Sequence, residues 1–502
     1  MCSISNETIL GMLADGSLTH EQLVHNLAAT LVGSLPASWD NGAFAQLKED
    51  GLLCDMGEGY APYCPRYLLP DYGKLMEQGC AFLCIAPPTT LKEAILALEM
   101  FYRHVPSITH YPVYLGRLDQ LLEPFIQDRE EAYGLIYDFL VFLDRSIPDS
   151  YCHGNIGPEK TVAGAIIVDI ETKLQKAIPS LTLLYDPEIT PRDFAEDCVR
   201  CELACAKPSF ANHKEYSQLY PQGYGIASCY NALPIGGGAF TLSRLVLKNM
   251  ADKAVNSQDF FANVLPHCVE TLCQFVEDKI GFLVEKSHFF TSNFLVKEGF
   301  LSLEQFFGMV GMVGLAECTN ILMEKDGSQG TYGHSQESDD LAERILQAIQ
   351  HQVGQFESAY CSGNGHRFHL HAQVGIDTDI GVSAGVRIPI GQEIDLYDHL
   401  RHAGRFHPYF TSGVGDIFPF DQTAKTNPSA IVDIINGGFA SGMRYFSTYC
   451  QDCDVVRITG YLVKRSDMDA LSQGQAIPQA NTYWGLGSRD NNRSLERKVR
   501  QL

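Results

Sequence analysis

Cysteines in two short clusters are the first residues whose types and spacing could do chemistry. Cys198, Cys201 and Cys205 form C-x2-C-x3-C, a pattern compatible with a metal or iron-sulfur site. Together with Phe194, however, they step by four, three and four, which places all four on one stripe of a helix. Free cysteine behaves as a small hydrophobic residue. We therefore interpret this cluster as a buried helix face and expect no metal there.

The second cluster, Cys450 and Cys453, forms C-x2-C just before a strand-like segment, VVRITGYLV. Two cysteines leave a tetrahedral zinc site two ligands short, and no further pair lies nearby. His369 and His371 alternate on one face of an expected strand, but their apolar neighbours are typical of an ordinary two-faced strand. Neither pair is assigned as a metal site.

A glycine run, Gly236–Gly238, precedes a helix-like segment at 239–250 and could hold a phosphate at a helix N-terminus. It lacks the Lys-Ser/Thr of a P-loop and the spacing of a dinucleotide-binding fingerprint, so nucleotide binding is only weakly indicated. No HExxH occurs, and we expect no metalloprotease and no conventional hydrolase.

Two distant segments point to a different chemistry. The segment Arg457-Ile458-Thr459-Gly460-Tyr461 resembles the glycyl radical motif, Arg-Val-x-Gly-Tyr/Phe, of the glycyl radical enzyme superfamily. The segment 224–229, with 208–212 upstream, resembles the cysteine-loop region of pyruvate formate-lyase and its relatives, and Cys229 falls at their radical cysteine. Segments 307–317 and 442–446 are similar to stretches of the anaerobic ribonucleotide reductases. The resemblance covers residues 200–502 and is greatest to the YjjI-type branch.

This resemblance implies both a fold and a mechanism. The implied fold is a ten-stranded α/β barrel of two five-stranded halves, surrounded by helices, with the cysteine and glycine loops meeting inside as fingers. Gly460 would store a backbone radical, and Cys229 would become a thiyl radical that abstracts hydrogen from a small metabolite. No cofactor would be bound permanently, because a separate S-adenosylmethionine/[4Fe-4S] activating enzyme installs the radical. The resemblance also implies anaerobic function and oxygen-triggered cleavage of the chain at the glycine.

The chemistry explains why these residue types are needed. A radical at Cα is stabilised when the amide and carbonyl groups on either side share one plane with it, and a Cβ substituent crowds that plane, so glycine suits it best. The cysteine must keep its proton to donate a hydrogen atom, which an apolar pocket favours by disfavouring the thiolate. Residues 226, 227, 233 and 235 are apolar. We expect Cys229 to be buried, uncharged and in near-contact with Gly460, at about 3.5–4 Å between reacting atoms.

The chain also departs from known subfamilies. Ser228 replaces the first of the two adjacent cysteines of pyruvate formate-lyase, so pyruvate cleavage is not expected. Asn231 stands where diol dehydratases and choline-cleaving members have a glutamate base, and an amide cannot take up a proton. Glu393 and Asp416 are candidates for that base, and Arg387 and Arg405 are candidate cations for an anionic substrate.

Several functions therefore stay open. The leading hypothesis is a lyase or eliminase acting on a small metabolite. The alternatives are a nucleotide-reductase-like enzyme, a non-catalytic protein that accepts a glycyl radical, and a metal-binding regulator that uses the clustered cysteines.

The elements that must position these residues are expected to be helices before about residue 200, then alternating strands and glycine-rich turns. Thr90 and Glu93 predict a capping box that opens a helix continuing to Tyr102. The apolar segment 303–323 predicts a buried helix, and FHLHAQV and GVRIPI between 368 and 394 predict strands. We expect a barrel region with a helical N-terminal part over residues 1–380 and a C-terminal glycine radical region over 381–502.

The amino-acid composition limits the kinds of partner that this protein can bind. The 502 residues carry a net charge of -23, with a pI of about 5.0, which gives no driving force for binding nucleic acid or an anionic membrane. No secretion signal or membrane span is evident, and the sixteen cysteines fit a reducing compartment. We expect a cytoplasmic protein that acts on a small molecule with the activating enzyme as its partner, with a homodimer left open.

Overall fold

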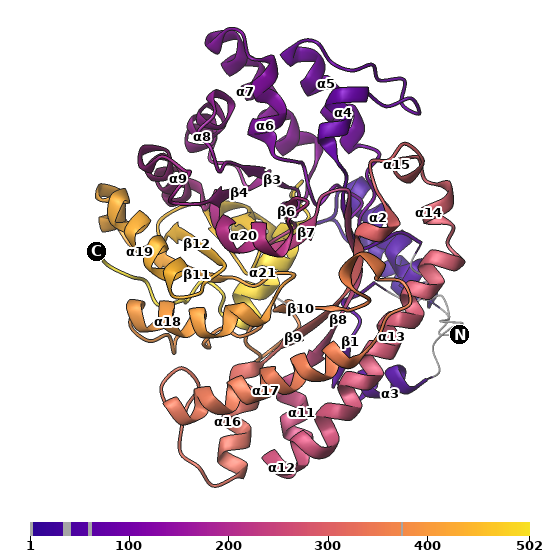
Figure 1. Cartoon of the computed structure of the whole chain (residues 1–502), viewed down its shortest axis with the longest axis vertical. Helices are drawn as coiled ribbons and strands as arrows, with labels where there is room; N and C mark the ends of the chain where they lie inside the picture. Colours follow the sequence, from indigo (N-terminus) through magenta and orange to yellow (C-terminus); the bar gives the residue numbers. More distant parts are fainter. Residues whose placement is uncertain (1–3, 34–41, 59–62, 373–374) are drawn as a thin grey trace.

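The protein is built around two five-stranded sheets flanked by helices (Figure 1). The computed structural model describes residues 4–33, 42–58, 63–372 and 375–502. The strands are β1 (Leu53–Cys54), β2 (Tyr67–Leu69), β3 (His153–Ile156), β4 (Ser180–Tyr185), β5 (Ser209–Asn212), β6 (Tyr224–Ala227), β7 (Asn231–Pro234), β8 (Gly237–Val246), β9 (Phe306–Val313), β10 (His369–Ala372), β11 (Asp416–Phe420), β12 (Tyr445–Cys450), β13 (Val455–Arg457) and β14 (Leu462–Lys464).

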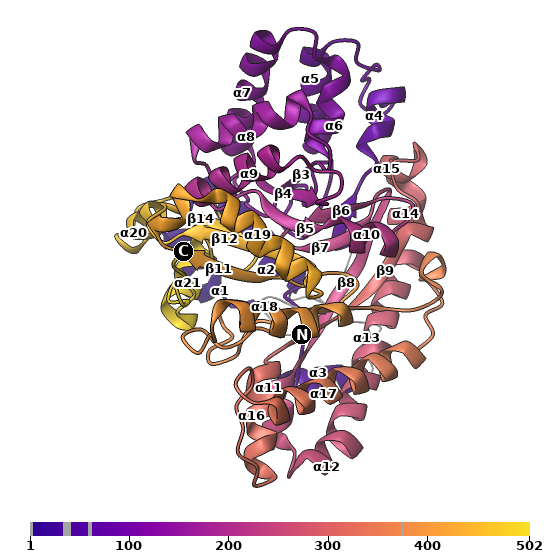
Figure 2. The same ribbon diagram turned by 60° about the vertical axis from the view of Figure 1, so that its left-hand side comes forward.

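Helices cover the outer faces of these sheets and form the two ends of the molecule (Figures 1 and 2). They are α1 (Asn6–Ala14), α2 (His20–Gly33), α3 (Ala43–Glu49), α4 (Tyr72–Gln78), α5 (Leu91–Tyr102), α6 (Leu118–Leu122), α7 (Arg129–Ser146), α8 (Val162–Leu174), α9 (Arg192–Cys205), α10 (His213–Leu219), α11 (Leu247–Lys253), α12 (Ser257–Asp259), α13 (Leu265–Glu285), α14 (Phe289–Ser292), α15 (Phe294–Lys297), α16 (Leu315–Lys325), α17 (Gln336–Gln355), α18 (Leu396–Phe406), α19 (Pro428–Ala440), α20 (Arg465–Ser472) and α21 (Asn481–Asn492).

Both sheets are mixed. In the first, β8, β9 and β10 are parallel, and β1 and β2 both pair antiparallel to β8. In the second, β3, β4 and β5 are parallel, β12 pairs antiparallel to β5, and β11 is parallel to β12. Among the described residues no ladder joins the two sheets. The expected α/β class and the two sets of five strands are therefore present, but these ladders do not close a ten-stranded barrel.

The two sheets lie side by side in the middle of the molecule, with the hairpin β6–β7 between them (Figures 1 and 2). This hairpin contacts β3 of the second sheet and both β2 and β8 of the first. A second two-stranded hairpin, β13–β14, packs against β12 and α9. The second sheet combines strands from before and after residue 380.

Two expected helices are strands instead. Residues 306–313 form β9, after a 3-10 turn at Leu303–Gln305, and the α-helix covers Leu315–Lys325. The break falls at Gly314, which has φ +76°, a left-handed conformation that favours glycine. Likewise residues 237–246 form β8, and the helix α11 starts only at Leu247. Gly236–Gly238 therefore do not stand at a helix N-terminus, which a phosphate-binding turn of that kind would require.

Of the other predicted helices and strands, some are confirmed and some are wrong. The capping box at Thr90 and Glu93 is confirmed at the start of α5. Residues 369–372 form the expected strand β10, whereas 385–390 form no strand. The first 200 residues are mostly helical, but they also supply β3 and β4 of the second sheet.

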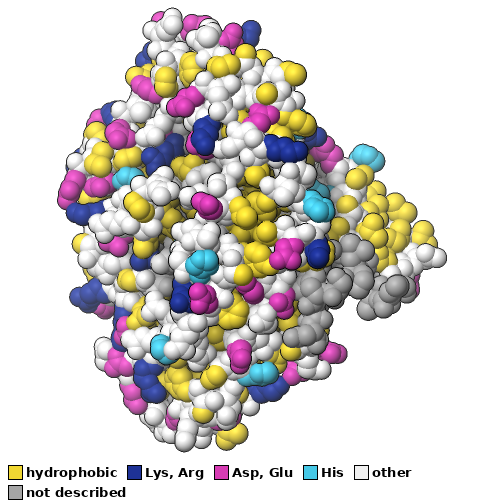
Figure 3. Space-filling view, turned by 45° about the vertical axis from the view of Figure 1, so that its right-hand side comes forward, with side chains coloured by type: hydrophobic (Ala, Val, Ile, Leu, Met, Phe, Trp, Pro, Cys, Tyr) yellow, Lys and Arg dark blue, Asp and Glu magenta, His cyan; other side chains and the backbone are white. Residues whose placement is uncertain are grey.

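The surface is mixed in character. On the face in Figure 3, basic and acidic side chains are interspersed, and hydrophobic side chains gather on a projecting lobe. In the described part of the chain, no helix combines the length and apolar character needed to cross a bilayer.

Candidate active site

Cys229 stands at the tip of the hairpin β6–β7. Residues 228–230 connect the two strands, and Ser228 has φ +60°, which lets the chain reverse tightly. Cys229 is 4% exposed. Its expected burial is therefore confirmed, and the hairpin carries it into the interior between the sheets.

Polar side chains from the second sheet fix this hairpin. Asn155 on β3 donates its amide to the Ile226 carbonyl (2.9 Å) and accepts the Ile226 N–H (2.8 Å). His153 Nδ1 lies 3.0 Å from the Ser228 carbonyl oxygen, and burial lowers the pKa of this histidine to about 3. The imidazole is thus neutral and can donate one hydrogen bond to that carbonyl.

The network continues to the backbone of Cys229 itself. The Thr182 hydroxyl bonds both His153 Nε2 and the Tyr445 hydroxyl, each at 2.7 Å. The Tyr445 hydroxyl also lies 3.3 Å from the Cys229 carbonyl oxygen, so its single hydrogen is shared between that carbonyl and Thr182. Strands β3, β4 and β12 therefore position the cysteine through buried hydrogen bonds, which are costly to break in a low-dielectric interior.

Gly460 stands in the turn of the other hairpin, β13–β14. Ile458 N–H donates to the Tyr461 carbonyl across this turn at 3.1 Å. Arg457 is 1% exposed and donates Nη1–H to the Gly460 carbonyl (3.3 Å) and Nη2–H to Ala206 on the other side (3.1 Å). The arginine of the motif therefore ties the glycine turn to the end of α9.

The two hairpin tips touch. A Cβ atom built on Gly460 would lie 2.1 Å from Cβ of Cys229 and 3.0 Å from its Sγ. Real Cβ atoms do not approach other heavy atoms that closely, so only glycine fits at 460 without a shift of the cysteine. Residues separated by 231 positions in the sequence are thus brought into direct contact.

The surroundings keep the Cys229 thiol protonated. Burial raises the pKa of Cys229, and this effect outweighs the lowering by the Tyr230 backbone and by the charges of Arg387 and Arg457. Asn231 Nδ2 lies 3.4 Å from Sγ and also donates to the Ala227 carbonyl at 3.0 Å. A neutral thiol is the form that can give up a hydrogen atom.

The C-terminal segment closes over the glycine hairpin. Arg497 is 7% exposed, and it donates to the carbonyl oxygens of Ile458 and Ser494. Arg500 donates to the Ile394 carbonyl (2.6 Å), and its backbone pairs with Pro419 and Asp421 beside β11. The last residues of the chain therefore hold the backbone next to Gly460.

The candidate bases and cations separate into two groups. Asp416 is buried and lies 3.0 Å from His399 Nε2 and 3.7 Å from Arg387 Nε. Burial opposes its ionisation, but His399 and Arg387 outweigh that effect and hold the pKa of Asp416 below its usual range. Glu393 and Asp416 line one cavity, and the Glu393 carboxylate accepts the Gly391 N–H.

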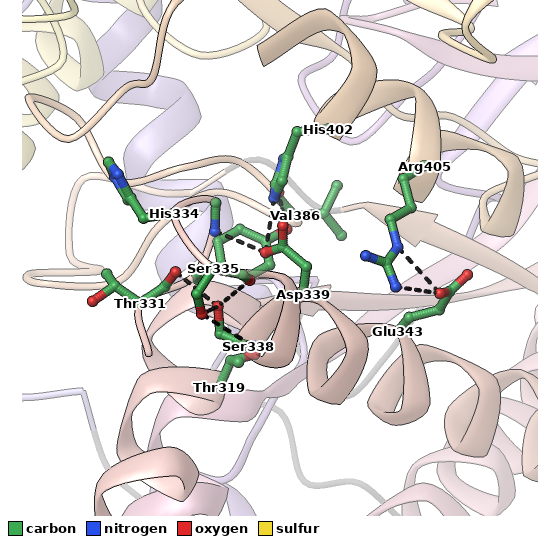
Figure 4. A network of polar contacts seen from close by, with 12 residues as sticks. Thr319, Thr331, His334, Ser335, Ser338, Asp339, Glu343, Val386, His402 and Arg405 are labelled. Carbon is green, nitrogen blue, oxygen red and sulfur yellow. Dashed lines mark hydrogen bonds and ion pairs between the residues drawn. The ribbon is translucent and has the colours of Figure 1, made fainter. Parts of the chain in front are cut away.

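Arg405 lies elsewhere. It pairs with Asp340 and Glu343 of α17, each at 2.6 Å, and Figure 4 shows the pair with Glu343. In the same view His402 faces Asp339, at 3.4 Å between Nε2 and Oδ1. The expected role of Arg405 beside an anionic substrate at Cys229 is not supported by this position.

The cysteine clusters occupy packed positions. Cys198, Cys201 and Cys205 are buried on α9 as the helical spacing predicts, with 3.7 Å between the sulfurs of the last two. Cys453 donates to the Leu203 carbonyl at 2.8 Å. His369 bonds Asn364 at 2.6 Å. Within the described ranges, no group of three or more His, Cys, Asp or Glu side chains is arranged to hold a metal ion.

One hydrolase-like pattern, G-x-S-x-G, does occur, at Gly381–Gly385. In α/β-hydrolases this pattern forms a sharp turn from a strand to a helix. Here residues 381–385 form turns and bends outside any strand or helix, and the Ser383 hydroxyl donates to Glu317 at 2.5 Å. The pattern is therefore no nucleophile elbow.

Sequence reasoning missed the residues that position the two hairpins. His153, Asn155 and Thr182 lie in strands whose residues are all buried. A polar residue inside a buried strand needs a hydrogen-bond partner. That need was the signal that these three residues hold other segments. Arg497 gave no comparable signal, because its partners are carbonyl oxygens of a segment 39 residues away.

Comparisons with known proteins agree with this geometry. A family model described as "Glycyl radical enzyme YjjI-like" matches residues 18–500. An uncharacterized protein of Haemophilus influenzae is 42% identical over 455 residues, covering 90% of this chain and 88% of the relative. The Escherichia coli protein YjjI is 39% identical over 490 residues, covering 97% and 94%.

Solved structures share the fold at low identity. The anaerobic ribonucleotide reductase of Thermotoga maritima with dATP in its specificity site gives a TM-score of 0.71 at 14% identity, covering 91% of this chain and 93% of that chain. The hydroxyproline dehydratase of Clostridioides difficile with trans-4-hydroxy-L-proline bound gives 0.66 at 12% identity, covering 100% and 89%. The chain belongs to the YjjI-like family of glycyl radical enzymes.

Proposed function

We propose that Gly460 stores a backbone radical and that Cys229, as a thiyl radical, abstracts hydrogen from a small metabolite. The observation that carries this proposal is the contact of the two hairpin tips, 3.0 Å from a built Gly460 Cβ to Cys229 Sγ. Burial of Cys229 and the raised pKa of its thiol support the same roles. Arg457, Ile458, Thr459 and Tyr461 would then hold the glycine turn.

The proposed steps are homolytic and balanced. The radical at Gly460 Cα takes the hydrogen atom of the Cys229 S–H bond, which leaves a C–H bond at the glycine and an unpaired electron on sulfur. The thiyl radical then takes a hydrogen atom from carbon of the substrate. After the substrate radical has rearranged or eliminated, it takes a hydrogen atom back from Cys229, and the sulfur recovers one from Gly460.

The lyase or eliminase outcome is part of the same proposal, as is a separate S-adenosylmethionine/[4Fe-4S] activating enzyme that installs the radical under anaerobic conditions. We also propose that the two five-stranded sheets correspond to the two halves of the family's barrel. The alternative of a nucleotide-reductase-like enzyme is supported by the fold alone. Asn231 stands where dehydratase-type members have a glutamate base, so no base is assigned at that position.

Electron paramagnetic resonance after anaerobic activation tests the proposal. The expected signal is a doublet from the one hydrogen left on Gly460 Cα, which collapses when the protein contains α-deuterated glycine. Exposure to oxygen should then cut the chain at Gly460. The Gly460→Ala variant should give no doublet, whereas Gly437→Ala, an exposed helix glycine with open space for a Cβ, should keep it. A doublet that survives Gly460→Ala would contradict the assignment.

A further inference from the structure

A cavity of about 390 Å³ adjoins the glycine hairpin. Its walls come from the loop 381–393, from Asp416 at the start of β11, from Thr459 of the glycine hairpin and from the C-terminal segment 491–497. Its volume is that of a small-molecule site. Thr459 is the neighbour of Gly460, so a ligand in this cavity would contact the hairpin directly.

Buried polar atoms on these walls have no partner within the described residues. Three of them can donate a hydrogen bond, Arg387 Nη1, Thr459 Oγ1 and Ser494 Oγ, and the fourth, Asn492 Oδ1, is an acceptor. The residues of the three donors are 9%, 7% and 1% exposed. Buried polar groups are nearly always hydrogen-bonded, because an unpaired one loses its hydration without compensation. Three unpaired donors on one cavity indicate a ligand that supplies acceptors.

The two buried arginines of the cavity define the charge of that ligand. Arg497 makes no ion pair with a carboxylate in the described part of the chain, and its hydrogen bonds go to backbone carbonyl oxygens. Arg387 donates Nε–H to the Gly415 carbonyl at 2.8 Å and stacks over Tyr230, next to Cys229, at 5.6 Å. Among the residues that the structure describes, Asp416 is the one carboxylate paired with Arg387, at 3.7 Å from Nε, and Arg497 has none, so the two buried guanidinium groups leave positive charge that a bound anion would compensate.

The acidic groups of the cavity are already engaged. Asp416 pairs with His399 and lies 3.7 Å from Arg387 Nε. Glu317 accepts the hydroxyl and backbone N–H of Ser383, and Glu393 accepts the Gly391 N–H. Arg493, the remaining arginine of the wall, pairs with Glu496 at the surface. Arg387 Nη1, which has no partner in the described ranges, and the positive charge of Arg497, whose Nη1 and Nη2 already donate to carbonyl oxygens, are therefore the features left to attract an incoming anion.

We propose that this cavity binds a small oxyanion, a carboxylate or a phosphate ester, held between Arg387 and Arg497 with hydrogen bonds from Thr459 and Ser494. Guanidinium groups suit both anions because their planar forks match two oxygens at once. The bound anion bridges the C-terminal segment and the glycine hairpin, and so braces the backbone beside Gly460.

Titration calorimetry on the unactivated full-length protein tests this site, with orthophosphate and succinate as the two probes. One of them should bind with a stoichiometry of one, and which one binds tells phosphate ester from carboxylate. Arg387→Gln should weaken binding at least about tenfold, the loss expected for a charge-assisted hydrogen bond. Arg405→Gln, which removes a cation on α17 outside the cavity, should leave binding unchanged.

Ser494→Ala provides a variant that folds without penalty, because the hydroxyl it removes has no partner. It should weaken binding several-fold, and the bound probe should slow amide exchange in the turn 458–461. The absence of binding by both probes up to about 10 mM, or equal weakening by Arg387→Gln and Arg405→Gln, overturns the proposal. Binding needs no radical, so its failure leaves the function proposed for Gly460 and Cys229 untouched, and the converse also holds.

Discussion

At the scale of single residues, position 460 is constrained twice. A Cβ there would disturb the planar backbone that stabilises a radical, and it would also collide with Cys229, 2.1 Å from its Cβ. The steric constraint holds whether or not a radical is ever formed. A loss of signal in Gly460→Ala therefore needs the isotope experiment beside it, since the methyl group alone displaces the cysteine.

Reversible hydrogen transfer between Cys229 and Gly460 predicts exchange with solvent. The thiol exchanges its proton for deuterium in D2O, the glycyl radical takes up that deuterium, and the return step can leave deuterium on the radical carbon. The doublet of the activated protein should then collapse to a narrow line in D2O. In Cys229→Ala the doublet should form and persist in D2O.

Cys361→Ala is the matched control, because that cysteine is also fully buried but lies outside the hairpins. It should behave like the wild-type protein. A collapse in D2O that continues in Cys229→Ala would show that another group exchanges with Gly460. A doublet that persists in the wild type would favour a protein that accepts a radical without passing it to sulfur.

Tyr445 should act as a positioning residue. Tyr445→Phe removes the hydroxyl whose hydrogen is shared between Thr182 and the Cys229 carbonyl. We expect a loss of about 1 kcal/mol in the free energy of unfolding and a several-fold slower collapse of the doublet in D2O. Tyr102→Phe, which removes a buried hydroxyl bonded to the Leu115 carbonyl, should lose similar stability without slowing the exchange. Equal effects of both variants on exchange would assign Tyr445 a purely structural role.

The residues in contact were predictable from the sequence, and the residues that hold them were not. Cys229 and Gly460 sit in short motifs, so a local pattern was enough. The partners of the cysteine hairpin are side chains of β3, β4 and β12, and Arg497 binds a turn that precedes it by 39 residues. Such hydrogen bonds depend on how distant strands are placed, which no local pattern encodes.

At the scale of elements, strand β9 shows why the spacing of apolar residues and glycines wrongly predicted a helix. Every residue of 306–313 is buried, so both faces of the strand are apolar and the two-residue alternation of a half-buried strand is missing. Glycines at 308, 311 and 314 then gave a three-residue spacing that imitates a helix face. The helix begins only after Gly314, where the backbone turns left-handed.

Two helix glycines give a matched test of packing around the second sheet. A Cβ on Gly404 of α18 would lie 2.0 Å from the carbonyl oxygen of Ser441, whereas Gly437 of α19 has open space. We expect Gly404→Ala to lower the free energy of unfolding by about 1–3 kcal/mol. Gly437→Ala should raise it by up to about 1 kcal/mol, because alanine loses less backbone entropy in a helix. Urea denaturation measures both, and a neutral Gly404→Ala would contradict the close crossing.

Asp119 in α6 should make stability depend on pH. Burial raises its pKa to about 7, although the N–H groups of Gly157 and Gln120 and the Thr161 hydroxyl stabilise the carboxylate. Between the unfolded pKa near 3.8 and about 7, the native state binds the extra proton, so stability decreases as pH rises through this window.

Asp119→Asn cannot ionise and should lack that decrease. Relative to wild type, its free energy of unfolding should rise as the pH goes from 6 to 7, at up to about 1.4 kcal/mol per pH unit, and level off by pH 8. Urea titrations at pH 6, 7 and 8 measure this difference. Asp193→Asn, at a carboxyl whose pKa Lys160 lowers, should show no change in that range. Parallel curves for wild type and Asp119→Asn would contradict the raised pKa.

At the scale of the whole molecule, the proposed radical site depends on three separate parts of the chain meeting between two sheets. The hairpin β6–β7 bridges the sheets, the hairpin β13–β14 meets its tip, and the C-terminal segment fastens the second hairpin through Arg497 and Arg500. Because the sheets share no hydrogen-bonded ladder among the described residues, these contacts decide how well Cys229 is shielded.

Cysteine labelling reads out that shielding directly. With iodoacetamide at pH 8, Cys84, which is exposed, should react quickly, and Cys229, which is buried, only through opening of the site. Arg497→Gln removes charged hydrogen bonds to the glycine hairpin, so opening should become at least about tenfold more frequent and labelling of Cys229 correspondingly faster. Peptide mass spectrometry over time gives the rate for each cysteine.

Arg493→Gln is the control from the same segment, since that arginine pairs with Glu496 at the surface. Its Cys229 rate should match wild type while the Cys84 rate stays constant in all three proteins. If Cys229 of the wild type were labelled as fast as Cys84, the tail and hairpins would not enclose the thiol, and a thiyl radical formed there would meet solvent before any substrate.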